Sequence, residues 1–190
     1  RFSSYWYAVG SNDKFLSNNV DDALRARGAL RPSATKQQWD ANVGFGGPLM
    51  QDKIWFYGSY RNYGSNQEPT GAYRALDPAA VVFTPPTIVN GVITSANSAD
   101  LSNPAINELR NHNFNGRLTM QTSSNSKLSV YADQMPRVVG ANGLGATTTY
   151  EATTRYGNDI NSIIQATWNW TVTSKVLVEI GETVKPDSWE

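Results

Sequence analysis

Few residues of this chain could carry out acid–base or covalent chemistry. The sequence contains one histidine, His112, and no cysteine. It also lacks the Gly-x-Ser-x-Gly motif that holds a serine nucleophile in many hydrolases. A catalytic histidine needs a partner within hydrogen-bond reach, and no residue spacing supplies one for His112. We therefore expect no enzymatic activity and interpret His112 as a solvated loop residue.

Asp and Asn side chains near the N-terminus form the one set with metal-binding chemistry. The stretch "SNDKFLSNNVDD" gathers hard oxygen ligands of the type that hold Ca²⁺. Its carboxylates are Asp13, Asp21 and Asp22. Their spacing differs from that of an EF-hand, and Asp and Asn are also common in ordinary turns. A structural calcium ion in an external loop is the one cofactor considered, and a plain polar loop is the alternative.

Four charged residues in strand-like segments require a wet surface: Arg61, Arg117, Asp133 and Glu179. We expect them to face the lumen of a channel, because a basic side chain facing lipid at mid-depth costs about 2–4 kcal/mol. Basic and acidic residues number 16 each, so the formal net charge is zero. Electrostatics therefore gives no reason to expect a nucleic-acid partner.

The elements that must position these residues are β-strands. Segments rich in aromatic and β-branched residues recur, separated by polar stretches with Gly, Asn and Ser. Within the polar stretches, a short helix over 19–28 has Asn19 or Asp21 as a cap and Gly28 as its end, and Asn90-Gly91 predicts a small type I′ hairpin. The seven predicted strands cover about 2–10, 38–46, 53–63, 113–121, 127–134, 160–170 and 175–182.

Long and short connections alternate along the chain. The long ones cover about 11–37, 64–110 and 135–157, and the short ones about 47–52, 122–126 and 171–174. Bacterial outer-membrane barrels have this asymmetry, with short periplasmic turns and long external loops. In the first short turn, we expect Gly46 and Gly47 to adopt positive φ and Pro48 to stop the strand.

Side chains alternate between apolar and polar in several strands. Phe114, Leu118 and Met120 share one side of their strand, opposite Arg117 and Thr119. Strands of about 9–11 residues suffice to cross hydrocarbon, and barrels carry aromatic girdles at both interfaces. The residues expected at the membrane interface are Phe45, Trp55, Phe56, Tyr57, Trp168 and Trp170. The loop tyrosines Tyr73, Tyr150 and Tyr156 could stack on sugars or peptides, or pack the loops together.

Several stretches resemble segments of TonB-dependent outer-membrane receptors, particularly the large Oar-like group. In chain order they are "VDDALRARGALRP", "NVGFGGPLMQDKIWFYGSYRNYG", "NFNGRLTMQTSSNSKLSVYAD" and "QATWNWTVTSKVLVEIG". This is the order found in that group. The resemblance implies a barrel of about 22 antiparallel strands around a globular plug, and this chain would be a partial segment of it. It also implies energy coupling to an inner-membrane complex through the plug, which these residues do not contain.

The sequence thus predicts an all-β, antiparallel transmembrane barrel, with residues 1–190 in one barrel domain and about seven strands visible. The expected location is the outer membrane of a Gram-negative bacterium. The expected function is passage of a ligand, such as a glycan, peptide or protein, through the plugged barrel, with outer-membrane lipid and the coupling complex as partners. Two alternatives remain open: a small structural or adhesive outer-membrane barrel, and a soluble carbohydrate-binding β-sandwich.

Overall fold

The computed structural model describes residues 1–27, 32–80 and 82–188. The protein is 67% strand and 6% helix, and its paired strands are antiparallel, which confirms the prediction of an all-β antiparallel fold. In the described part of the chain, no helix is both long and apolar enough to span a membrane.

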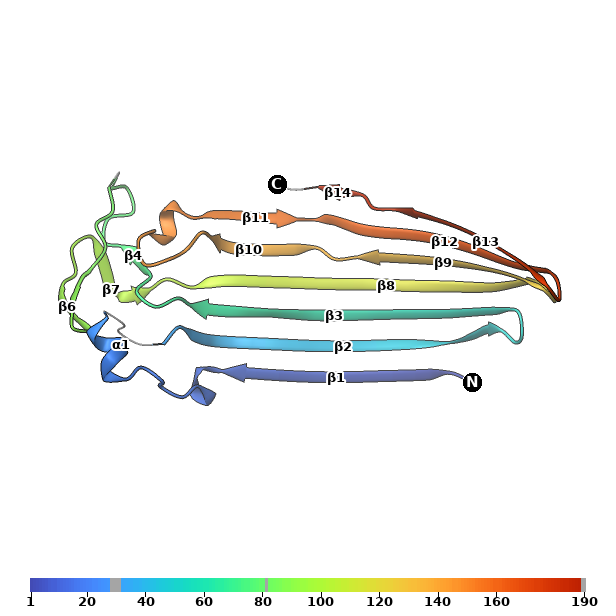
Figure 1. Cartoon of the computed structure of the whole chain (residues 1–190), viewed down its shortest axis with the longest axis horizontal. Coiled ribbons are helices and arrows are strands. Elements are labelled where there is room, and N and C mark those ends of the chain that lie inside the picture. The colour runs from blue at the N-terminus through green and yellow to red at the C-terminus, as the bar shows by residue number, and fades with distance from the viewer. Residues whose placement is uncertain (28–31, 81, 189–190) are drawn as a thin grey trace.

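Seven long strands form one continuous antiparallel sheet, which Figure 1 shows face on. Their order in space is β1-β2-β3-β8-β9-β12-β13, so each long strand pairs with the long strands that precede and follow it in the sequence. Within the described residues β1 and β13 are free edges, and the sheet is open. The strands are β1 (Ser3–Asn12), β2 (Ala34–Met50), β3 (Ile54–Glu68), β8 (Asn107–Ser123), β9 (Ser126–Gln134), β12 (Ile160–Thr173) and β13 (Val176–Val184).

The long connections lie together at one end of the sheet and contain further short elements (Figure 1). β10 pairs with β8 and β11, and β14 pairs with β12. In the hairpin of β5 and β6, Asn90 and Gly91 both have positive φ, as the sequence predicted. The elements in the long connections are η1 (Asp13–Phe15), α1 (Asp22–Ala26), β4 (Tyr73–Ala75), β5 (Thr87–Val89), β6 (Val92–Ser95), β7 (Ala99–Pro104), β10 (Arg137–Asn142), η2 (Tyr150–Ala152) and β11 (Thr154–Asn158). β14 (Asp187–Ser188) follows β13.

The helix α1 is capped as its sequence predicts. Asp21 is the N-cap, and its Oδ1 accepts from the backbone N–H of Leu24 at 2.8 Å. The proposed terminator, Gly28, lies outside the described residues.

Three strands run well past their expected ends into the long connections. β2 and β8 each contain 17 residues and β3 contains 15. At about 3.3 Å per residue, 17 residues extend roughly 55 Å, more than hydrocarbon alone requires. The expected loops 11–37, 64–110 and 135–157 are therefore partly strand, and the turns that the structure forms lie at 51–53, 124–125 and 174–175.

The Gly-Gly-Pro stretch is strand rather than turn, which corrects the expectation. Gly46, Gly47 and Pro48 pair with Tyr57, Phe56 and Trp55, and neither glycine has positive φ. β1 pairs with β2 only as far as Gly46, so Pro48 has a strand on one side alone. Proline has no backbone N–H to donate, so it is tolerated where only one side of the strand is paired. The turn follows, with Asp52 at φ 58° and Lys53 N–H donating to the carbonyl of Met50 at 3.1 Å.

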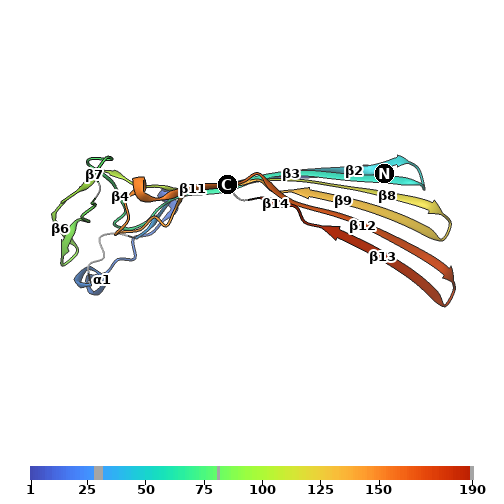
Figure 2. The same ribbon diagram turned by 90° about the horizontal axis from the view of Figure 1, so that it is seen from above.

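The buried core lies at the loop end of the molecule. Its apolar residues are few, and most of them are small: Ala72, Tyr73, Ala99, Ala105, Val139 and Ala141. Viewed from the side, the seven-stranded sheet is a single curved layer, and β12 and β13 diverge from β2 and β3 toward the short turns (Figure 2). In the described part of the chain, no second layer covers either face of the sheet at its centre.

Candidate functional site

The two faces of the seven-stranded sheet differ in chemistry. Residues opposite each other in a ladder point to the same face, so the strand registers define both sets. The apolar face comprises Trp6, Val43, Phe45, Phe56, Phe114, Leu118, Val130, Ala132, Ile164, Ala166, Trp168, Trp170, Ile180 and Val184, with Glu182 as a charged member. The polar face comprises Tyr5, Tyr7, Asp40, Asn42, Tyr57, Arg61, Asn113, Asn115, Arg117, Tyr131, Asp133, Gln165 and Glu179.

The apolar face is uncovered although its side chains are large. Trp6 is 81% exposed, Ile180 57% and Phe114 49%. The rings of Phe2 and Phe45 stack with centroids 5.7 Å apart, and Trp168 and Trp170 stack at the same separation. An exposed apolar patch that extends over seven strands is an interaction surface in a native protein.

An ion pair anchors the polar face near the long connections. Arg61 donates to Asp40 from Nε at 2.8 Å and from Nη2 at 2.5 Å. Tyr7 donates its hydroxyl to the same carboxylate at 3.2 Å, and the guanidinium of Arg61 lies 4.4 Å from the ring centroid of Tyr63. The charge of Arg61 is thus balanced within the sheet.

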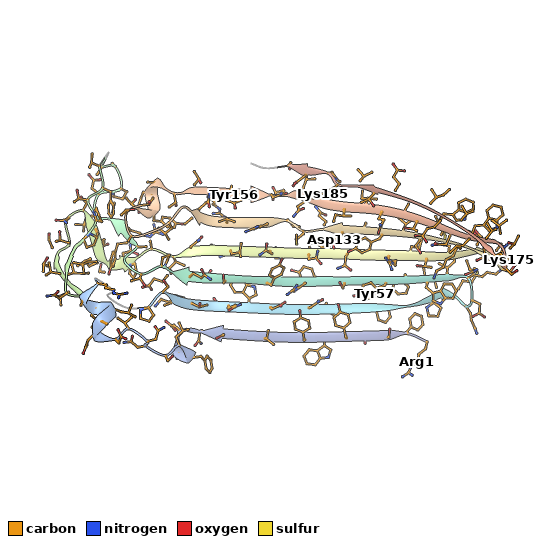
Figure 3. The ribbon with its side chains drawn as sticks, in the orientation of Figure 1. Arg1, Tyr57, Asp133, Tyr156, Lys175 and Lys185 are labelled. Atoms are coloured by element: carbon orange, nitrogen blue, oxygen red, sulfur yellow. The ribbon has the colours of Figure 1, made fainter. Side chains whose placement is uncertain are left out.

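Two tyrosines meet nearer the middle of the polar face. The hydroxyls of Tyr5 and Tyr57 are 3.0 Å apart, and the ring of Tyr5 lies directly over Gly44. Figure 3 shows where Tyr57 lies on its strand. The ring of Tyr5 fits over Gly44 because Gly44 has no side chain.

A second polar cluster surrounds Asp133, which Figure 3 labels. Its carboxylate accepts from Nδ2 of Asn113 at 2.9 Å and from the hydroxyl of Tyr131 at 2.8 Å. The guanidinium of Arg117 lies 5.7 Å from the ring centroid of Tyr131. Neutral donors satisfy Asp133, so Arg117 has no carboxylate partner among the described residues. The polar face can therefore offer a cation to a group outside this sheet.

The registers place all four predicted charged residues, Arg61, Arg117, Asp133 and Glu179, on the polar face. The clusters bring together Arg61 with Asp40 and Arg117 with Tyr131, whereas Glu179 is exposed on β13 opposite Asn169. The predicted interface aromatics divide between the faces. Phe45, Phe56, Trp168 and Trp170 lie on the apolar face; Trp55 and Tyr57 lie on the polar face. Adjacent residues of a strand point to opposite sides, so three consecutive aromatics cannot share one face.

The connection between β3 and β8 and the connection between β9 and β12 contact each other through Glu151. Its Oε2 accepts from Thr149 Oγ1 at 2.7 Å and from the backbone N–H of Ala75 at 3.1 Å. Arg74 lies 3.9 Å from the ring centroid of Tyr150 and 3.8 Å from Oε1 of Glu151. Burial acts to raise the pKa of Glu151, but these hydrogen bonds and the charge of Arg74 outweigh it, so the pKa lies below its usual value. The charged form of Glu151 therefore fastens the connections together.

The loop tyrosines are not open platforms. Tyr73 is 6% exposed and belongs to the core, which agrees with the alternative that these tyrosines pack the loops together. The ring of Tyr150 is covered on one side by Arg74, and Tyr156, labelled in Figure 3, is half-buried in β11.

The candidate calcium ligands do not converge. Asp13 Oδ2 lies 3.1 Å from Nζ of Lys36, Asp21 caps α1, and Asp22 lies in the first turn of α1. Within the described ranges, no group of three His, Asp or Glu side chains is placed to hold a metal ion.

His112 is not a solvated loop residue. It lies in β8, where its Nδ1 and the hydroxyl of Tyr60 are 2.8 Å apart. Nearby, Trp39 donates its indole N–H to Asn62 Oδ1 at 2.7 Å. Sequence reasoning missed this cluster because it began the strand at 113 and so left His112 in the preceding loop. Extending the period-two alternation of β3 and β8 toward the long connections would have brought these residues to one face.

Comparisons with known proteins identify no relative: no protein-family model, no curated protein and no solved structure matches the chain.

Proposed function

We propose that this chain is part of the wall of an outer-membrane transport barrel of the TonB-dependent type. In this arrangement the apolar face contacts lipid and the polar face lines the lumen. The proposal rests chiefly on one observation: a single-layer sheet with a large uncovered apolar face and a hydrogen-bonded polar face. A membrane is the environment in which both faces are solvated.

The grouping of connections supports the same proposal. All long connections gather at one end of the sheet and all short turns at the other, as in bacterial outer-membrane barrels. The resemblance of the hairpin sequences to Oar-like receptors favours this class over other barrels. The full barrel would have about 22 strands.

In this function, a ligand such as a glycan, peptide or protein passes along the polar face when a plug is displaced. Arg117, which has no carboxylate partner among the described side chains, is available to the plug or to the ligand. Energy would reach the barrel from the inner membrane through the plug.

The alternatives fit these observations less well. A carbohydrate-binding sandwich would require a second layer over the apolar face, and the described part of the chain provides none. A small adhesive barrel would require closure by these strands, yet β1 and β13 are both free edges among the described residues.

Fluorescent labels on adjacent residues test the orientation of the sheet. The chain has no cysteine, so Val130→Cys and Ser129→Cys each introduce a unique labelling site. In bilayers, we expect a fluorophore at position 130 to be quenched by lipid-bound quenchers and one at 129 by aqueous iodide. Equal quenching by iodide at both positions would contradict a lipid-facing apolar face.

Transport itself is tested in cells that make the protein and in cells that lack it. Fluorescent mixtures of oligopeptides and of glycans serve as probes, with and without a protonophore. We expect uptake that depends on both the protein and the proton gradient. Protein-dependent uptake that survives the protonophore would overturn energy coupling, and equal uptake in both cell types would overturn a transport role for these ligands.

A further inference from the structure

A polar groove lies on the same side of the sheet as the apolar face, next to the long connections. It has a volume of about 450 Å³ and is lined by Gln37, Trp39, Asn62, Asn66, Arg110 and His112. The registers place it just beyond Val43, Tyr60 and Phe114, where the apolar face ends. If the apolar face lies in hydrocarbon, this groove is at the level of lipid headgroups.

Arg110 gives the groove a partly free cation. Its Nη2 contacts Glu108, at 3.4 Å from Oε1 and 3.3 Å from Oε2. Both contacts use the same nitrogen, so Nη1 and Nε have no partner among the described residues. The side chain is 56% exposed. Nη1 and Nε point to different sides of the guanidinium, so each can donate one charge-assisted hydrogen bond to an oxyanion.

His112 and Trp39 are held in fixed orientations beside Arg110. The hydrogen bond between Tyr60 and Nδ1 of His112 leaves Nε2 as the nitrogen with no partner in the described chain. The indole of Trp39 lies over Gly64 and donates to Asn62. Tryptophan prefers the membrane interface because its ring is apolar while its N–H is polar.

The groove also holds an unused acceptor. Asn66 Oδ1 is buried and has no hydrogen-bond partner among the described residues. A buried amide oxygen without a donor is costly, so a hydroxyl donor reaching it after a small side-chain movement would stabilise the site. Lys36 is excluded from the site because Asp13 and Glu68 both pair with it.

We propose that this groove binds the phosphate-bearing, hydroxyl-bearing headgroup of a lipid in the leaflet next to the long connections. Arg110 and His112 contact the phosphate, a headgroup hydroxyl reaches Asn66, and the acyl chains lie along Val43 and Phe114. The inference rests on the proposed membrane location of the apolar face. Glu108 already contacts Nη2 of Arg110, so the phosphate contacts a nitrogen of the guanidinium that Glu108 leaves free.

The test measures lipid retained by the detergent-extracted protein, using native mass spectrometry. The probe is lipid A with two phosphates, compared with the same lipid after phosphatase treatment. Arg110→Ala removes the proposed contact. Arg117→Ala is the matched control, because it removes the same side chain from the same strand but from the polar face.

We expect Arg110→Ala to lower the affinity for lipid A by about tenfold or more, the usual effect of losing a charge-assisted hydrogen bond. Arg117→Ala and the unchanged protein should retain the lipid equally, and dephosphorylated lipid should bind weakly to all three. Equal loss in both variants, or equal retention of both lipids, would overturn the inference. Displacement of lipid A by inorganic phosphate at low millimolar concentration would also overturn it, and would indicate a free-anion site.

Failure of this inference is distinguishable from failure of the proposed function. A protein whose label at position 130 is quenched by lipid, yet which releases lipid A equally in both variants, lacks the headgroup site but keeps its membrane location. A protein that does not insert into bilayers at all overturns both.

Discussion

Glycines on two neighbouring strands make room for aromatic rings. A side chain at Gly44 would collide with the ring of Tyr5, and one at Gly47 would collide with the ring of Phe2. Gly64 is hemmed in by the ring of Trp39 and the carbonyl of Leu109. Such pairs stabilise a sheet because the ring covers backbone that glycine would leave exposed. These glycines have no functional side chain, but they fix the positions of the aromatic residues beside them.

Replacing Gly44 with alanine tests this role. We expect Gly44→Ala to lower the free energy of unfolding by about 1–3 kcal/mol, because the new methyl group displaces the Tyr5 ring. Urea unfolding of the detergent-solubilised protein measures the change. Gly58→Ala is the control, since the nearest atom to its added carbon would be 3.8 Å away. Equal effects of the two substitutions would show that the ring position does not matter.

Glu151 gives the docking of the long connections a defined pH dependence. Its pKa in the folded protein lies below the usual value of 4.5. The contribution of the charged carboxylate is therefore fully present above the usual pKa and is lost as the pH falls through the lowered one. We expect the amide NMR signal of Ala75, whose N–H donates to Glu151, to shift over that acidic range. In Glu151→Gln the shift should vanish; a shift that persists would assign it to another group.

At the level of strands and turns, alternation predicts well where each face has one kind of residue. In β8, Phe114, Leu118 and Met120 lie on the opposite face from Arg117 and Thr119, as the sequence predicted. Prediction failed where local signals compete with the ladder. Gly-Gly-Pro is a strong turn signal, yet pairing with β3 extends the strand through it.

The ends of the long strands could not be predicted from local pattern. Beyond the apolar band, the residues of β2, β3 and β8 are mostly polar on both sides, with exceptions such as Trp39 and Leu109, so hydropathy does not mark where these strands end. Contacts such as Arg74 with Tyr150 join segments far apart in sequence, and no spacing rule connects them. The polar-face clusters were only partly predictable: charged residues pointed to the face, but the tyrosines that hold them did not.

The turn between β2 and β3 places a non-glycine residue in the left-handed region. Asp52 has φ 58°, which aspartate tolerates better than a β-branched residue does. We expect Asp52→Val to cost about 1–2 kcal/mol and Asp52→Asn to change stability by less than about 0.5 kcal/mol. Thermal unfolding in detergent compares the two. Equal stability of both variants would mean that the turn relaxes to negative φ.

At the scale of the whole molecule, the proposed orientation predicts opposite responses to charge on the two faces. Ala166 and Gln165 are adjacent in β12 and point to the apolar and polar faces. We expect Ala166→Arg to make folding into bilayers less favourable by about 2–4 kcal/mol. Gln165→Arg should change the stability by no more than about 0.5 kcal/mol. Urea titration of vesicle-inserted protein measures both. A smaller cost at position 166 than at 165 would reverse the assignment of the faces.

The direction of the edge strands limits how this sheet can be completed. Seven strands in strict antiparallel order leave β1 and β13 pointing the same way. Joining the two edges directly would therefore create a parallel seam, and so would any ring of identical copies standing upright in one membrane. An antiparallel closure requires an odd number of intervening strands, and the first and last of these must run from the long connections toward the short turns. Neither edge contains a lysine or a proline that would discourage such pairing.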